Sequence, residues 1–151
     1  MVAHNFLLAH IQVTKLYKEQ YAGVDGLIGI SNCGDFRYPK VEYSERDQEA
    51  ALRAMLFQWG WFVEPLVFGH YPAVMRERLG DRLPNFTLEE QKQLIGSTDF
   101  FGLNYYSSLL ASSPEVEATY SDYWTDIYVN FTYVFSGALY VIPSFASDAL
   151  D

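Results

Sequence analysis

Two short, continuous apolar runs most constrain the fold that this sequence can adopt. Residues 26–31 read GLIGIS and residues 99–106 read DFFGLNYY. Apolar runs of this length are typical of strands in a parallel sheet that helices cover on both faces. A sheet of only two strands can neither close nor bury its edges. The sequence therefore predicts an α/β protein, of whose sheet this chain holds only a part.

The sequence before the first apolar run predicts a helix over residues 2–21. Apolar residues recur there at spacings of three and four, which places them on one face of a helix. Charged residues fall on the other side. We expect the apolar stripe to be the buried face, and its main members are Val2, Phe6, Ala9, Val13 and Leu16.

Three further helices are predicted from residues that favour helix ends. Hydroxyl and carboxylate side chains cap the N-terminus of a helix, and glycine favours its C-terminal end. These signals predict helices over 47–59 (candidate N-caps Ser44 and Asp47), 71–80 (Pro72 and Gly80) and 87–96 (a capping box from Thr87 to Glu90).

The segments between these helices carry weaker patterns. We expect a turn at 36–39, an interruption of the helix at 59–65 and a long loop over 107–135. Residues 127–147 carry no charge and are about as long as a membrane span. Tyrosines, polar residues and a proline break up this stretch, so a loop followed by a short strand is favoured over a transmembrane helix.

Charge and composition exclude several classes of function. The net charge of −9 repels phosphate backbones and anionic lipid, so nucleic acid and membrane surfaces are not expected partners. One cysteine allows neither an internal disulfide nor a cysteine-based zinc site. His4 and His10 are not spaced as paired metal ligands on one helix face, so we expect them to pack or to tether loops. Aromatic residues make up 17% of the chain, which suits either dense packing or a carbohydrate cleft.

Motifs distributed along the first two thirds of the chain resemble glycoside hydrolase family 1. Each motif is short, but all of them occur in the order that the family has. They are the stretch from His4 to His10, the run from Ile28 to Pro39, Gly60-Trp61-Phe62, Gly69-His70-Tyr71-Pro72, Arg82-Leu83-Pro84 and the run from Asp99 to Ser107.

The resemblance implies a partial (β/α)₈ TIM barrel, from about strand four or five to strand six with their helices. A complete barrel of this kind takes about 250 residues, so the chain would hold a quarter to a third of one. We therefore expect residues 1–151 to be a fragment of one barrel domain. Residues 108–151 match the family poorly and are expected to form a loop and tail.

The resemblance also implies a retaining β-glycosidase acting on O-glycosyl bonds, which works with two carboxyl groups roughly 5–5.5 Å apart and needs no metal or organic cofactor. The family carries these groups in Asn-Glu-Pro and Glu-Asn-Gly motifs, and neither tripeptide occurs here. Glu64-Pro65 follows valine and lies after Gly60-Trp61-Phe62, so Glu64 is not expected to be a catalyst. We expect a β-glycoside substrate for the intact barrel and no activity for this chain alone.

Three residues remain as site candidates by resemblance. Tyr106, with Asn104 beside it, corresponds to the family's Asn-x-Tyr at the end of strand six, whose tyrosine donates a hydrogen bond to the nucleophile. A packing role at the strand end is the alternative for Tyr106. Asn32 follows strand five and is a candidate contact to the sugar or aglycone.

Two other interpretations stay open at the level of sequence. A non-catalytic carbohydrate-binding or interaction protein would keep part of the barrel without its chemistry. A truncated gene model without function would explain a chain that opens inside an uncapped helix at Met1.

Overall fold

The computed structural model describes residues 2–21, 23–116, 122–135 and 138–142. The chain divides into two compact units, each built from two stretches of sequence. The first unit comprises Met1–Gly34 and Gln58–Asn104, and the second comprises Asp35–Phe57 and Tyr105–Asp151.

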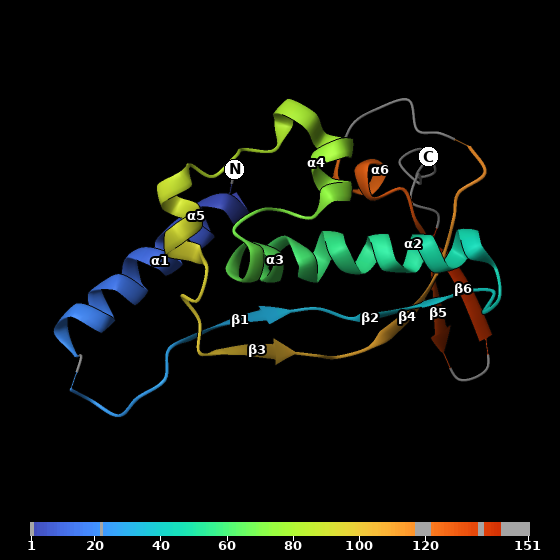
Figure 1. Cartoon of the computed structure of the whole chain (residues 1–151). Coiled ribbons are helices and arrows are strands. Elements are labelled where there is room, and N and C mark those ends of the chain that lie inside the picture. Colours follow the sequence, from blue (N-terminus) through green and yellow to red (C-terminus); the bar gives the residue numbers. More distant parts are fainter. Residues whose placement is uncertain (1, 22, 117–121, 136–137, 143–151) are drawn as a thin grey trace, which may run out of the picture. The chain divides into compact units, whose positions relative to one another are not determined.

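The first unit combines a parallel strand pair with four helices. Strands β1 and β3 run side by side in Figure 1, paired from Gly29 with Phe100 to Cys33 with Asn104. In the same unit, α1 and α3 both pack against α5. The elements are α1 (Val2–Gln20), β1 (Gly29–Cys33), α3 (Trp61–Phe68), α4 (Ala73–Leu79), the 3₁₀ turn η2 (Gly80–Arg82), α5 (Leu88–Leu94) and β3 (Phe100–Asn104).

The core of the first unit lies among these helices. Its fully or nearly fully buried members are Leu7, Ile11, Leu66, Tyr71, Met75, Leu83, Phe86 and Leu94. The helix predicted over 2–21 is confirmed, but the prediction of its buried face is wrong. Phe6 and Val13 are 61% and 57% exposed, because α1 instead turns Leu7, Ile11 and Thr14 inward.

The second unit is a four-stranded sheet with one long helix on it. The strand order is β2-β4-β5-β6, with β2 and β4 parallel and the other two pairs antiparallel. Helix α2 packs along β2 and β4 (Figure 1), and its alanines at 50, 51 and 54 are buried, which allows close approach. The elements are β2 (Phe36–Pro39), α2 (Glu45–Met55), β4 (Ser108–Ser112), α6 (Tyr123–Ile127), β5 (Asn130–Phe135) and β6 (Ala138–Ile142).

The helix ends confirm most of the cap predictions. Ser44 caps α2 by accepting a hydrogen bond from Asp47 N, whereas Asp47 lies in the first turn and is not the cap. Thr87 and Glu90 form both bonds of the predicted capping box. Gly80 ends α4 with a φ of 51°, in the left-handed region that favours glycine.

Several predictions of irregular structure are wrong. The expected turn at 36–39 is strand β2, and the expected loop over 107–135 contains β4, α6 and β5. Residues 56–60 form a π-helical turn, η1, that leads into α3, so 59–65 is helical with Pro65 inside it. The first predicted strand begins only at Gly29, where its pairing with Phe100 begins, and Leu27 before it is 74% exposed.

The uncharged stretch over 127–147 forms strands in its described part. Strands β5 and β6 account for most of it, and residues 143–147 lie outside the described residues. The prediction of a loop before one short strand is therefore wrong. Among the described helices, none combines the length and the hydropathy that crossing a bilayer requires.

Candidate functional site

In the first unit, Asn104 and Ser31 lie on the same face of the β1–β3 pair. Asn104 ends β3, and its Nδ2 donates a hydrogen bond of 3.4 Å to Ser31 Oγ. Gly102 pairs with Ser31 in the strand register, and a Cβ at Gly102 would lie 3.1 Å from Ser31 Oγ. Glycine at this position therefore leaves the space that the serine side chain occupies. Both Ser31 and Asn104 are exposed, so this face presents polar groups at the carboxyl end of β3.

The opposite face of the same strand pair is turned toward the helical segment around η1. Asn32 Nδ2 donates to the backbone carbonyl of Gln58 at 3.5 Å. The ring of Phe101 contacts that of Trp59 at 6.5 Å between centroids, and a Cβ at Gly34 would overlap the Trp59 indole. Successive side chains along a strand point to opposite faces. Asn32 and Asn104 therefore point in opposite directions.

In the second unit, a carboxylate organises the backbone that follows Tyr106. Asp35 Oδ1 accepts hydrogen bonds from Ser107 N at 3.1 Å and from Ser107 Oγ at 2.9 Å. The backbone carbonyl of Ser107 accepts a third bond, from Phe36 N at 3.1 Å. Arg37 lies 3.6 Å from Asp35 Oδ2, and its guanidinium carbon lies 4.8 Å from the centre of the Phe131 ring.

Tyr106 itself presents its ring to solvent. The residue is 78% exposed, and its hydroxyl has no hydrogen-bond partner in the part of the chain that the structure describes. Its neighbour Tyr105 is engaged, with its hydroxyl 2.6 Å from Ser108 Oγ. The Tyr106 hydroxyl can therefore bind a group that is not among the described residues, whereas the Tyr105 hydroxyl is already bound to Ser108.

The histidines and Glu64 belong to the helical part of the first unit. His4 Nδ1 lies 2.9 Å from the hydroxyl of Tyr71, and His10 Nε2 lies 3.1 Å from Ser97 Oγ, which confirms the expected packing and tethering roles. Burial lowers the pKa of both imidazoles. Glu64 lies within α3, and burial raises the pKa of its carboxyl while His70 and Arg76 oppose that shift.

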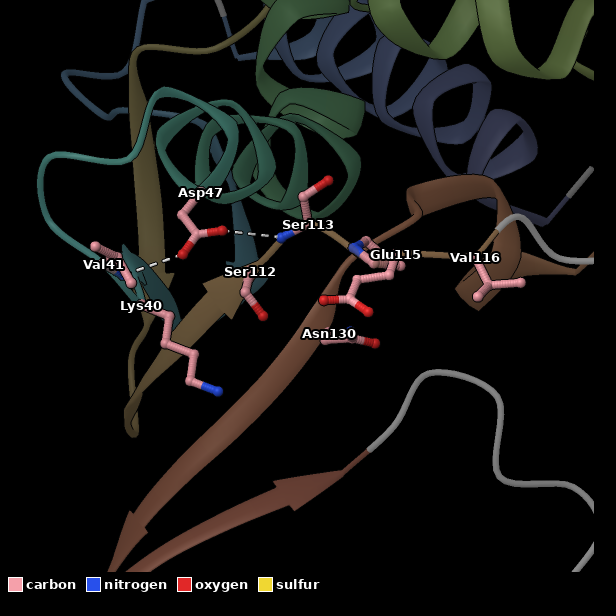
Figure 2. A pocket seen from close by; sticks show the side chains of 9 residues that line it. Lys40, Val41, Asp47, Ser112, Ser113, Glu115, Val116 and Asn130 are labelled. Atoms are coloured by element: carbon pink, nitrogen blue, oxygen red, sulfur yellow. Dashed lines mark hydrogen bonds between the residues drawn. The ribbon is translucent and has the colours of Figure 1, made fainter.

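A pocket of about 520 Å³ lies in the second unit (Figure 2). At one side of it, Asp47 accepts backbone hydrogen bonds from Val41 and Ser113, both at 3.1 Å. Asp47 is 8% exposed, so it holds these segments and is not offered to a ligand. The residues that line the pocket are Lys40, Val41, Asp47, Ser112, Ser113, Pro114, Glu115, Val116 and Asn130. Within the described ranges, no group of three or more histidine, cysteine, aspartate or glutamate residues could hold a metal.

Sequence reasoning pointed to Asn104 and Tyr106, but it took Asp47 only for a candidate N-cap and missed that Asp35 and Asp47 hold distant backbone. An aspartate that follows a strand or opens a helix has many ordinary uses, so neither stood out. Nothing near Asp47 in sequence reveals its bond to Ser113, which lies 66 residues away. Asp35 would have required knowledge that the chain pairs residue 36 with residue 108.

The chain is similar to known proteins in both sequence and fold. A family model described as glycosyl hydrolase family 1 matches residues 1–139. Oleuropein β-glucosidase of Olea europaea is 43% identical over 126 residues, which cover 83% of this chain and 23% of that protein. Raucaffricine-O-β-D-glucosidase of Rauvolfia serpentina is 42% identical over 134 residues, which cover 86% and 25%.

Solved structures of β-glucosidases have the same fold as this chain over most of its length. A β-glucosidase from rice superposes with a TM-score of 0.82 at 36% identity, covering 86% of this chain and 28% of that one. A β-glucosidase from Trichoderma harzianum superposes with a TM-score of 0.78 at 42% identity, covering 85% and 27%. The predicted partial TIM barrel is thereby confirmed. The chain spans about a quarter of the length of the curated relatives it matches, and it belongs to glycosyl hydrolase family 1.

Proposed function

We propose that this chain forms part of the barrel wall of a retaining β-glycosidase that hydrolyses the O-glycosidic bond of a β-glucoside-like substrate. The observation that carries the proposal is the match of residues 1–139 to the family, together with relatives named as β-glucosidases at 42–43% identity. All 151 residues are proposed to belong to one barrel domain.

The proposed reaction is a double displacement by two carboxyl groups. One carboxyl group protonates the leaving oxygen and later activates water, and the other attacks the anomeric carbon. The Asn-Glu-Pro and Glu-Asn-Gly tripeptides do not occur in these 151 residues. We therefore expect the two carboxylates to lie on barrel strands outside this sequence, and we expect the isolated chain to hydrolyse no glycoside. The two carboxylates supply the proton transfer and the covalent step, so no cofactor is proposed.

Tyr106 is proposed to donate a hydrogen bond from its hydroxyl to the nucleophile carboxylate. Such a bond stabilises the ionised form, lowers the pKa of the carboxyl and fixes the direction of attack. The exposed ring of Tyr106 supports this role, since its hydroxyl is not engaged within its own unit. Asn104 supports it as well, because its amide lies on an exposed face at the end of β3.

Asn32 is proposed as a contact to the sugar or aglycone, and this role has a structural condition. Its amide donates to the Gln58 carbonyl, on the face toward the helical segment. A contact with a ligand would therefore require another rotamer of Asn32. Asn104 needs no such change.

The experiment that tests the proposal places this chain in a complete barrel. In the β-glucosidase of Trichoderma harzianum, which is 42% identical, the matched segment is replaced by residues 1–139 of this chain. The resulting barrel chimera is assayed with p-nitrophenyl β-D-glucoside. We expect Tyr106→Phe to lower kcat about tenfold to hundredfold, the loss expected for one hydrogen bond to a charged group.

The matched control is Tyr43→Phe, which removes the same hydroxyl from a residue that is 89% exposed in the same unit. We expect this control to leave kcat unchanged. A folded chimera in which Tyr106→Phe and Tyr43→Phe behave alike would contradict the role of Tyr106 and leave it a packing residue.

A further inference from the structure

Ser107, which lies between Tyr106 and β4, is held in place by hydrogen bonds to two residues. Ser107 is bound at three atoms: its N and Oγ donate to Asp35, and its carbonyl accepts from Phe36 N. These bonds lie between 2.9 and 3.1 Å, within the ordinary range for strong hydrogen bonds. Two of them share one acceptor, Asp35 Oδ1, so the position of that carboxylate decides where Ser107 lies.

The Asp35 carboxylate is itself held by a buried cation. The side chain of Arg37 is only 9% exposed, lies 3.6 Å from Asp35 Oδ2 and has its guanidinium over the ring of Phe131. Burial of a guanidinium is costly unless an anion accompanies it. Arg37 therefore attracts the Oδ2 side of the Asp35 carboxylate, which leaves Oδ1 directed at Ser107.

Tyr106 contrasts with the residue that follows it. Its side chain is 78% exposed and makes no hydrogen bond in the described part of the chain. The direction of its ring therefore depends on the backbone that carries it. The nearest fixed point on that backbone within the same unit is Ser107.

We propose that Asp35, held by Arg37, is a positioning residue that fixes Ser107 and thereby aims the hydroxyl of Tyr106. This inference rests on the proposed function, in which Tyr106 meets the nucleophile carboxylate. Asp35 touches neither the substrate nor the reacting atoms in this scheme. It acts only through the backbone that it holds.

The contact itself can be tested on the full 151-residue chain by amide hydrogen exchange. Asp35→Asn removes the charge but keeps the shape of the side chain. We expect the Ser107 amide to exchange about tenfold faster, since a hydrogen bond to a carboxylate is replaced by a weaker neutral one. Glu42→Gln is the matched control, because it removes the same charge from an exposed side chain of the same unit. Equal exchange of the Ser107 amide in both variants would overturn the proposal.

The consequence for catalysis is tested in the barrel chimera with a double-mutant cycle of Asp35→Asn and Tyr106→Phe. We expect Asp35→Asn to lower kcat severalfold with KM unchanged. Loss of the hydrogen bond to the nucleophile raises the pKa of that carboxyl, so the acidic limb of kcat/KM should move to higher pH. In the Tyr106→Phe background, Asp35→Asn should have no further effect.

The outcomes separate this inference from the proposed function. If Tyr106→Phe lowers kcat and Asp35→Asn adds a full independent loss on top of it, Asp35 does not act through Tyr106 and the inference is overturned. If Tyr106→Phe has no effect, the role proposed for Tyr106 fails and the inference fails with it. Ser107→Ala serves as a second variant that leaves the Asp35–Arg37 pair in place. It should lower kcat less than Asp35→Asn does, again only when Tyr106 is present.

Discussion

The two compact units hold their strands with different chemistry. In the first unit, α1 anchors the segment before β3 through Thr14 Oγ1 to the Ser97 carbonyl at 3.2 Å and His10 to Ser97 Oγ at 3.1 Å. In the second unit, the Asp35 carboxylate accepts from the distant Ser107 N, and the Asp47 carboxylate accepts from Val41 N and from the distant Ser113 N.

The difference lies in how the stabilisation is divided among residues. A neutral hydrogen bond contributes about 0.5–1.5 kcal/mol to stability, and one to a charged group contributes about 1.5–3 kcal/mol. The first unit spreads its anchor over several neutral bonds and one exposed bond to a carboxylate, from Ile28 N to Asp99 Oδ2 at 2.9 Å. The second unit concentrates it in single carboxylates, so single substitutions there should have larger effects.

The largest effect is expected at Asp47. Its two oxygens accept from Val41 N and Ser113 N, and the side chain is nearly buried. Asp47→Ala leaves two amides without their acceptor, so the free energy of unfolding should fall by about 3 kcal/mol. Urea denaturation of the chain measures it, with Glu49→Ala, an exposed carboxylate of the same helix, as the control. A loss of unfolding free energy no greater than that of Glu49→Ala would contradict the view that single carboxylates hold the second unit together.

A smaller effect is expected at Thr14 in the first unit. The residue is 3% exposed, and Thr14→Val keeps its shape while removing the hydroxyl that donates to the Ser97 carbonyl. We expect the free energy of unfolding to fall by about 1 kcal/mol in the same urea experiment. A loss as large as that of Asp47→Ala would show that the two units do not differ in the way described.

His10 should make the first unit sensitive to pH. Burial lowers the pKa of His10 below its ordinary value of 6.5. Between the ordinary and the lowered value, the unfolded chain binds more protons than the folded chain, so stability falls as the pH drops through this window. In His10→Gln, the slope of the unfolding free energy against pH should be shallower there. An unchanged slope would rule out His10 as a source of the pH dependence.

The smallest effect is expected at Lys18. Its Nζ donates to the Gly96 carbonyl at 3.3 Å, but the contact is exposed to solvent. Lys18→Ala should change the free energy of unfolding by less than about 0.5 kcal/mol, as is usual for exposed contacts of this kind. A loss above about 1 kcal/mol would show that Lys18, like Thr14 and His10, stabilises the segment before β3.

Local features were predicted well from the sequence. Ser44, Thr87 and Gly80 act within one helix turn, so their neighbours in sequence contain all the information about the cap. The buried position expected for β3 is not such a local feature, and the expectation is wrong, because Phe100 and Leu103 are 49% and 46% exposed.

Features that depend on distant pairing were not predicted. Strand β2 forms because Phe36 to Pro39 pair with Ser108 to Ala111, and nothing near residue 36 reveals that partner. For α1, two apolar faces compete, and packing against α5 selects the one that contains Leu7 and Ile11. The direction of Asn32 was likewise undetermined by sequence, since it depends on which face of β1 meets Gln58.

The proposal that this chain forms part of the wall of a β-glycosidase barrel is tested by the hydrolytic rate of the barrel chimera. We expect the chimera to hydrolyse p-nitrophenyl β-D-glucoside and the 151-residue chain alone to give no turnover. A folded chimera without activity, or turnover by the purified chain alone, would contradict the proposal.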